Sequence, residues 1–176
     1  MSGLIIRDPA LQITPEELLI DPRNFVFPSQ QTQRVYSWEE HVFTDCYLSY
    51  LTLDECREIV TTLWSKLGFV QASPQVFDGR GAGYARAKEC HELHLPQWAR
   101  NYTVLAHELA HCVMDPINSN DSLDHGGMFM HTYLYLLTLV TNHRYTDLEA
   151  SVRAHGLRIN RFNLLNYITK LNESTD

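Results

Sequence analysis

The run His107-Glu108-Leu109-Ala110-His111 constrains this chain more than any other feature of its sequence. Residues four apart project from one face of an α-helix, about 40° apart around its axis. A helix therefore places the two imidazoles side by side, with Glu108 one residue further round. Neutral imidazoles are good ligands for a divalent metal, and a carboxylate in this position can reach a water beside that metal. The run predicts a metal site with His107 and His111 as ligands and Glu108 as catalytic base.

The residues around this run favour a helix. Asn101 is a suitable N-cap, and Pro116 is expected to end the helix. Apolar residues recur on faces other than that of the two histidines, which leaves the histidine pair at the edge of a cavity. A chance match to the pattern is conceivable in a chain with nine histidines, so this context matters.

A second run, His91-Glu92-Leu93-His94, resembles the first but has a different spacing. Pro96 and the preceding alternation favour a strand from Glu89 to Leu95. Side chains three apart on a strand point to opposite faces, so His91 and His94 are not expected to share a metal. One of them is expected to face solvent and the other to line the cleft or the core.

A catalytic zinc usually keeps three protein ligands, so a third ligand is expected. The metzincin arrangement is excluded, because Met114 and Ile117 stand where it requires Gly and His. Glu149 lies far downstream, whereas His125 follows a loop long enough to fold it back and opens the next expected helix. The glycines after it would let that helix approach the first closely. We expect His125 to be the third ligand, His131 to be a packed or surface histidine, and the following histidines to be structural: His41, His143 and His155.

The remaining elements predict one α+β domain. Residues 1–33, which are rich in proline, are interpreted as an N-terminal arm with a short helix near Pro15 to Leu19, and residues 34–176 as a single domain. Arg34 to Phe43 is compatible with a strand or a short helix. The other expected elements are a helix that a Thr52–Glu55 capping box opens and Gly68 ends, two or three short antiparallel strands within residues 70–96, a helix from about Asp124 to Thr141, and at least one more over Asn160 to Leu171.

Composition excludes several classes of protein. The net charge of −7 makes nucleic acid an unfavourable partner, because a phosphate backbone binds basic surfaces. The longest apolar stretch, Met128 to Val140, is too short to span a membrane and is interpreted as a buried helix. The four cysteines form no C-x-x-C pair, and the N-terminus lacks a signal peptide, so a reducing, cytoplasmic location with free thiols is expected. The oligomeric state is left open.

The segments HELAH and HGGMF, separated by a loop, resemble the H-E-x-x-H…H-G-x-x-F pattern of SprT-like minimal zincin metallopeptidases. Gln33 to Glu39 also resembles the start of a group of small bacterial metallohydrolases with the same core. The likeness covers about residues 34–140 and is specific only at the ligand motifs. It implies a small antiparallel sheet packed on the active-site helix, and one Zn²⁺ on His107, His111 and His125. The cysteine-rich or DNA-binding tail that often accompanies that family is absent from this sequence, so DNA-linked activity is not carried over.

These residues favour a zinc-dependent metallopeptidase acting on a peptide or protein substrate, with Glu108 as general base. Asp124, beside His125, is expected either to orient the ring of a metal ligand by a hydrogen bond or to act as a helix N-cap. The strand that holds His91 and Leu93 is expected to pair with an extended substrate. No residue is assigned to stabilise the oxyanion; the candidates are Tyr84, Tyr102 and Tyr133. The alternatives are a non-catalytic zinc-binding or protein-interaction module on a zincin scaffold, and an amidase using the same metal.

Overall fold

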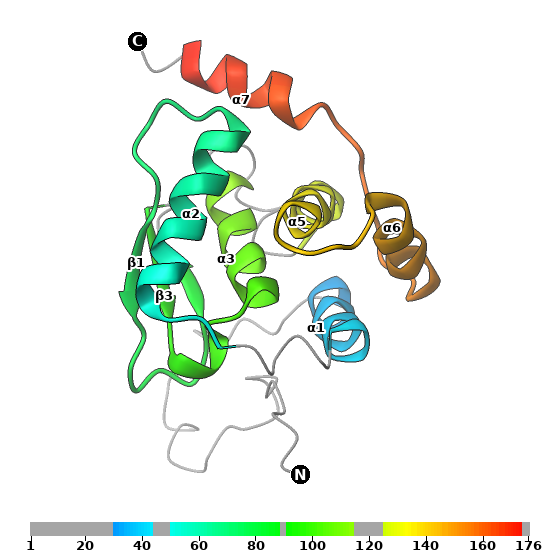
Figure 1. Cartoon of the computed structure of the whole chain (residues 1–176). Coiled ribbons are helices and arrows are strands. Elements are labelled where there is room, and N and C mark those ends of the chain that lie inside the picture. The colour runs from blue at the N-terminus through cyan, green and yellow to red at the C-terminus, as the bar shows by residue number, and fades with distance from the viewer. Residues whose placement is uncertain (1–29, 44–49, 89–90, 115–124, 174–176) are drawn as a thin grey trace, which may run out of the picture.

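The computed structural model of the protein describes residues 30–43, 50–88, 91–114 and 125–173. Within these residues the chain forms an α+β fold of six α-helices, one 3-10 helix and a three-stranded sheet (Figure 1). None of these helices is long and apolar enough to cross a membrane. The elements are α1 (Gln30–Val42), α2 (Leu53–Leu67), β1 (Gln75–Asp78), β2 (Arg86–Lys88), β3 (Glu92–Leu95), η5 (Gln97–Ala99), α3 (Tyr102–Met114), α5 (Gly127–Val140), α6 (Tyr145–Ala154) and α7 (Leu164–Glu173).

The predicted caps are present at the start of α2 and of α3. Thr52 and Glu55 make a reciprocal capping box at the start of α2, and Gly68 ends this helix in the left-handed conformation with a φ of 89°. At the start of α3, the Val104 N–H donates to Asn101 Oδ1 at 2.9 Å. These caps fix where the two helices begin, and so fix the position of His107 along α3.

The sheet differs from the predicted antiparallel arrangement. Its strand order is β1-β3-β2, and only the β2–β3 pair is antiparallel, because β1 and β3 run parallel. The residues between β1 and β2 carry the chain to the far edge and leave room for β3 between them. Gly79 permits this path, since a Cβ there would lie 2.7 Å from the Pro96 nitrogen. Alternating hydrophobicity indicates a strand but not the direction of its neighbours.

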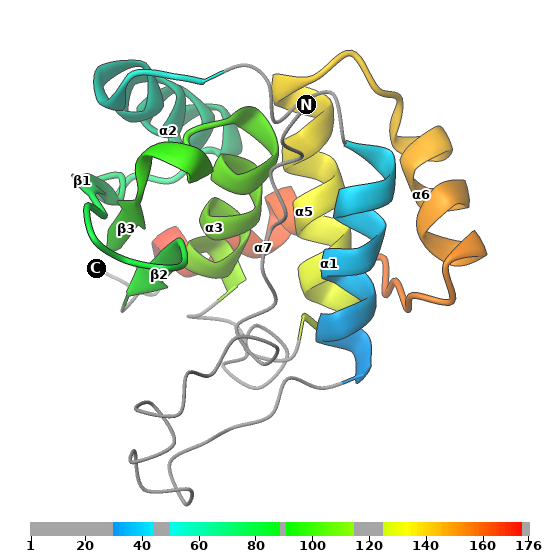
Figure 2. The same cartoon turned by 90° about the horizontal axis from the view of Figure 1, so that it is seen from below.

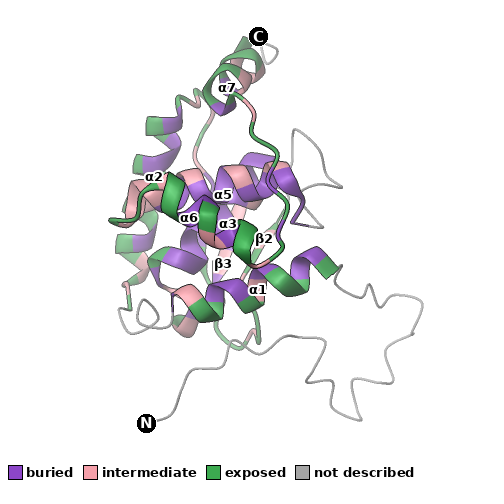
Figure 3. Cartoon of the chain, turned by 90° about the vertical axis from the view of Figure 1, so that its right-hand side faces the viewer, coloured by how far each residue is buried: buried purple, intermediate pink, exposed green. Residues whose placement is uncertain are grey.

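Helices α2 and α3 cover one face of the sheet, α2 against β1 and α3 against β2 (Figure 1). Val76, Leu93 and Leu95 point into this layer and are almost fully buried. Helix α5 packs on the other side of α3, and both helices are buried over most of their length (Figure 3). Helix α3 therefore lies at the centre of the core, which explains why it carries apolar residues on most of its faces.

Helix α1 lies beside α5 and α6 in both views of the fold (Figures 1 and 2). Most of the stretch Arg34 to Phe43 thus lies in a helix, the second of the two predicted options. This helix begins within the segment interpreted as the arm and ends at Val42. Trp38 anchors it, with a fully buried indole whose Nε1 donates to Ser151 Oγ on α6 at 3.0 Å. The predicted short helix near Pro15 lies outside the described residues.

Two of the predicted elements need revision in the C-terminal half. The helix predicted from about Asp124 to Thr141 is α5. It begins at Gly127 and not at Asp124, so His125 lies two residues before it. The expected helix over residues 160–171 is present as α7, shifted towards the C-terminus, and α6 precedes it. The sequence prediction had not identified α6 as a separate helix.

Candidate metal centre

His107, His111 and His125 lie together at the meeting point of α3 and the start of α5. Their ligand atoms all lie within 4.8 Å of one another, and the group could hold a metal ion. His107 Nε2 is 3.3 Å from His111 Nε2 and 2.9 Å from His125 Nε2. Ligands at ordinary zinc–nitrogen bond lengths around a tetrahedral ion lie about 3.3 Å apart, so the spacing suits such an ion. The sequence predicts this set of three residues.

The ring of Phe129 packs against all three imidazoles of the cluster. Its ring, fully buried on α5, lies 5.3 Å from the His107 ring, 4.5 Å from the His111 ring and 4.7 Å from the His125 ring, measured between centroids. Phe129 is the last residue of the HGGMF run, and its position one turn into α5 aligns this ring with all three imidazoles. An apolar wall of this kind excludes water and strengthens electrostatic interactions at the site.

Helix α1 supplies a partner to two of the three imidazoles. His107 Nδ1 lies 2.7 Å from Glu39 Oε1, and His125 Nδ1 lies 3.1 Å from Thr32 Oγ1. Because a carboxylate oxygen accepts hydrogen bonds, His107 donates from Nδ1, and its Nε2 faces the cluster. At His125, a metal bound through Nε2 would leave Nδ1 to donate to the Thr32 hydroxyl. Such outer partners are typical of metal-binding histidines.

Tyr36 completes this face of α1. It lies four residues after Thr32 and three before Glu39, so the three side chains share one stripe of the helix. Its ring stacks on His107 with a 5.8 Å centroid separation and meets His125 edge-on at 5.5 Å. None of these three residues was predicted from the sequence as a partner of the histidines. The available signal was their i, i+4, i+7 spacing, but Thr32 fell in the segment interpreted as the arm, and Tyr36 and Glu39 in a stretch left open between strand and helix.

Glu108 is buried beside this cluster and faces β2. Burial raises the pKa of its carboxyl above the usual range, and the charge of His107 and a hydrogen bond from the Ala87 backbone oppose the rise. Burial lowers the pKa of His107, but the Glu39 charge and hydrogen bond and the Glu108 charge outweigh this effect and raise it. Glu39 thus orients His107, whereas Glu108 accepts a hydrogen bond from the Ala87 backbone on β2.

The substrate-strand assignment of His91 and Leu93 is wrong. β3 is the central strand, so its backbone is hydrogen-bonded to β1 on one side and β2 on the other. Leu93 is fully buried, and His91 lies in the turn before β3, where its N–H donates to the Lys88 carbonyl and its own carbonyl accepts from Gln75. An additional strand can only join at β1 or β2.

Of the other candidate residues that the structure describes, Tyr133 lies against the cluster and the rest lie away from it. His94 pairs with Glu92 at 2.8 Å, and Glu149 is held by two arginines on α6 and the segment after it. His131, predicted to be a packed or surface histidine, contacts the Tyr145 hydroxyl through Nδ1 at 2.5 Å. Asp124 lies outside the described residues. Of the three candidate tyrosines, Tyr133 packs on His107 with a centroid separation of 5.3 Å, whereas Tyr84 and Tyr102 are exposed.

Comparisons with known proteins gave no match: no family model, no curated protein and no solved structure is significantly similar to this chain. The residues of the site are therefore the basis for any assignment of function.

Proposed function

We propose that this chain is a zinc-dependent hydrolase of peptide or amide bonds with a zincin-like core. The observation that carries the proposal is the convergence of three imidazoles through Nε2, with Glu39 and Thr32 on the Nδ1 side of two of them. Three protein ligands are the number usual for a catalytic zinc, whereas structural sites usually have four. A buried carboxylate that is not a ligand is also typical of a hydrolytic site.

The donor set fits Zn²⁺, because neutral imidazoles bind it well and hard oxygen-preferring cations poorly. His107, His111 and His125 would hold the ion. When bound, Zn²⁺ supplies Lewis-acid chemistry, which polarises a carbonyl and lowers the pKa of a water. The identity of the metal is part of the proposal.

Glu108 moves the proton in this proposal. It follows His107 directly on α3, so its carboxylate projects beside the imidazoles and not among them. It would take a proton from the attacking water and deliver it to the leaving amine. Its burial keeps bulk water from competing for that proton.

Strand β2 is the proposed docking edge for the substrate. It lies at one edge of the sheet, next to α3, and the Ala87 backbone contacts the Glu108 carboxylate. A peptide in extended conformation could add to this edge by main-chain hydrogen bonds and present its backbone close to Glu108. This replaces β3, whose two edges are occupied.

The test is hydrolysis of a mixed peptide library by the zinc-loaded protein, with Glu108→Gln as the variant. The glutamine keeps the size of the side chain but cannot take the proton, so we expect cleavage to fall by at least about 100-fold while zinc stays bound. Cleavage of small amides alone would indicate an amidase. Zinc binding without hydrolysis of any substrate would contradict the proposal and favour a non-catalytic zinc-binding module.

A further inference from the structure

An extended segment connects α6 to α7 and crosses the start of α5. Leu157 and Ile159 are buried, whereas Arg158 and Asn160 are exposed. This alternation is typical of extended backbone with one face on a core. We call residues 156–161 the strap.

The strap is bound to the first turn of α1. The Gln31 side-chain amide makes two hydrogen bonds with the Arg158 backbone: its Nε2 donates to the Arg158 carbonyl at 3.2 Å, and the Arg158 N–H donates to its Oε1 at 3.3 Å. Arg34 Nη1 also donates to the Gly156 carbonyl at 3.0 Å. Gln31 is buried and directly precedes Thr32, so the strap fixes the backbone from which Thr32 reaches His125.

The strap is also bound to the start of α5. The Asn160 N–H donates to the Gly127 carbonyl at 2.9 Å, and a Cβ on Gly127 would lie 2.6 Å from Asn160 Cγ. The sequence analysis assigned the glycines here to a close approach of α5 to α3, but the close neighbour of Gly127 is the strap. His125, two residues earlier, has a φ of 52°, which is uncommon outside glycine. The strap thus holds both partners of the Thr32–His125 contact.

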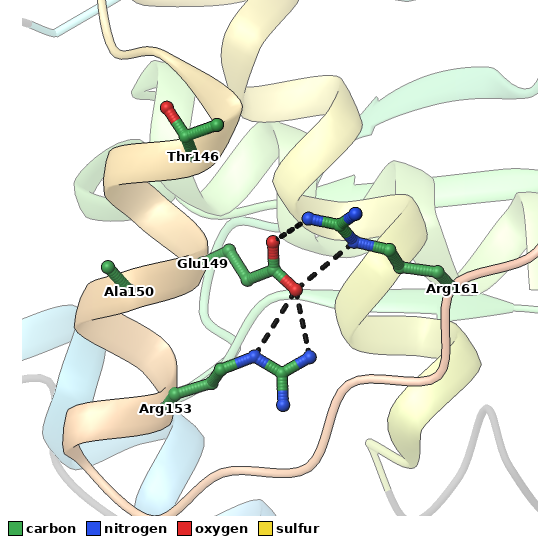
Figure 4. Close-up of a pocket in the computed structure, with 5 residues that line it drawn as sticks. All are labelled: Thr146, Glu149, Ala150, Arg153 and Arg161. Atoms are coloured by element: carbon green, nitrogen blue, oxygen red, sulfur yellow. Dashed lines mark hydrogen bonds and ion pairs between the residues drawn. The ribbon is translucent and has the colours of Figure 1, made fainter.

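Glu149 on α6 binds the strap through an ion pair with Arg161. Figure 4 shows its carboxylate between Arg153, from the same helix, and Arg161, from the strap. Arg153 Nη2 and Arg161 Nε lie 2.9 Å and 3.2 Å from Oε1. The Glu149 side chain is only 9% exposed, so its charge depends on these partners. Both arginines line an open hollow of about 500 Å³. The Arg161 side chain joins Glu149 to the strap and also lies over the Tyr145 ring, whereas the Arg153 side chain joins Glu149 to its own helix.

We propose that the strap is a positioning element for the third metal ligand. Through Gln31 and Gly127, Arg161 holds Thr32 and His125 in the arrangement that metal binding needs, although it touches neither. The inference depends on the proposed metal site, but not on hydrolysis. Loss of an outer partner typically weakens metal binding 10- to 100-fold, and a residue acting through that partner should fall near the lower figure.

The experiment compares Arg161→Met with Arg153→Met. Both variants remove one arginine from Glu149, but Arg153→Met leaves the strap attached. Zinc affinity is measured by competition with a coloured chelator. We expect binding about tenfold weaker in Arg161→Met, near-normal binding in Arg153→Met, and recovery in Arg161→Lys, which keeps the charge. Equal affinities of the two methionine variants would overturn the role of the strap.

A second readout separates positioning from general destabilisation. The visible absorption of the cobalt-loaded protein reports the ligands of the metal, so Arg161→Met should shift towards the spectrum of His125→Ala, and Arg153→Met should not. An unchanged spectrum would also contradict the inference. If Arg161→Met does not fold, Gln31→Leu breaks the same connection from α1 and is measured in the same way. A wild-type protein that binds no metal would overturn the metal site itself, whereas bound metal without peptide cleavage would affect only the proposed activity.

Discussion

Glu39 accepts a hydrogen bond from His107 across 68 residues of sequence, with 2.7 Å between Oε1 and Nδ1. Both side chains are almost fully buried. The contact links α1 to α3 and fixes which nitrogen of His107 faces the other imidazoles. It makes α1 a part of the candidate metal centre, although none of the three clustered histidines comes from this helix.

Replacing Glu39 should weaken metal binding. In Glu39→Gln the charge is lost but the shape is kept, and we expect zinc affinity to fall about tenfold because His107 loses its strongest orienting contact. Glu40→Gln is the matched control, since Glu40 is the exposed neighbour on the same helix. Competition with a chelator measures both. Equal losses in the two variants would show that Glu39 has no specific role.

The hydroxyl of Thr32 should matter more than its methyl group. Thr32→Val removes the oxygen that contacts His125 Nδ1 and keeps the branched shape, so zinc affinity should fall by up to about tenfold. Thr32→Ser keeps the oxygen and should bind zinc nearly as tightly as the wild type. If serine and valine gave the same affinity, packing and not the hydrogen bond would be responsible.

Gly127 should tolerate no side chain. In Gly127→Ala the new Cβ would meet both the Asn160 side chain and its backbone nitrogen, at 2.6 Å and 2.8 Å, so we expect the free energy of unfolding to fall by about 1–3 kcal/mol. Gly83→Ala is the control, because a Cβ there has open space around it. Denaturant unfolding of the metal-free proteins measures both changes. A loss no larger than that of the control would contradict the close packing of the strap.

Cys56 should make the protein more sensitive to alkali. Burial raises the pKa of its thiol from 9.0 to about 11. Between these values the unfolded chain has lost the proton and the folded chain has kept it, so the free energy of unfolding falls as pH rises from 9 to 11. Below pH 9 both states are protonated and the effect vanishes. Cys56→Ala should therefore lose less stability than the wild type between pH 8 and 11, measured by denaturant unfolding; a parallel loss would contradict this.

The sequence could predict the cluster of three histidines because their pattern is local. His107 and His111 belong to one helix, and His125 is identified by the glycines that follow it and by the resemblance of the HGGMF run. Glu39 and Thr32 could not be found in this way, because their partners are far away in sequence. Glu39 lay in a stretch ambiguous between helix and strand, and Thr32 in the segment interpreted as an arm. Only one helix through both segments aligns Thr32, Tyr36 and Glu39 on one face.

The strand order could not be predicted from the sequence either, but for a different reason. Alternation in Glu92 to Leu95 identifies a strand with one buried face, but it carries no information about what lies on either edge. Placing β3 in the centre depends on the path between β1 and β2. The substrate-strand assignment failed for this reason, and the strap was missed because its partners, Gln31 and Gly127, belong to two other elements.

The metal content of the purified protein tests the central claim most directly. Wild type and His125→Ala are stripped with a chelator, reloaded with zinc, desalted and analysed by elemental mass spectrometry. The three-histidine site predicts about one zinc per chain in the wild type and a sharp reduction in the variant. Absence of zinc from the wild type, or equal zinc in both proteins, would contradict a metal centre on His107, His111 and His125.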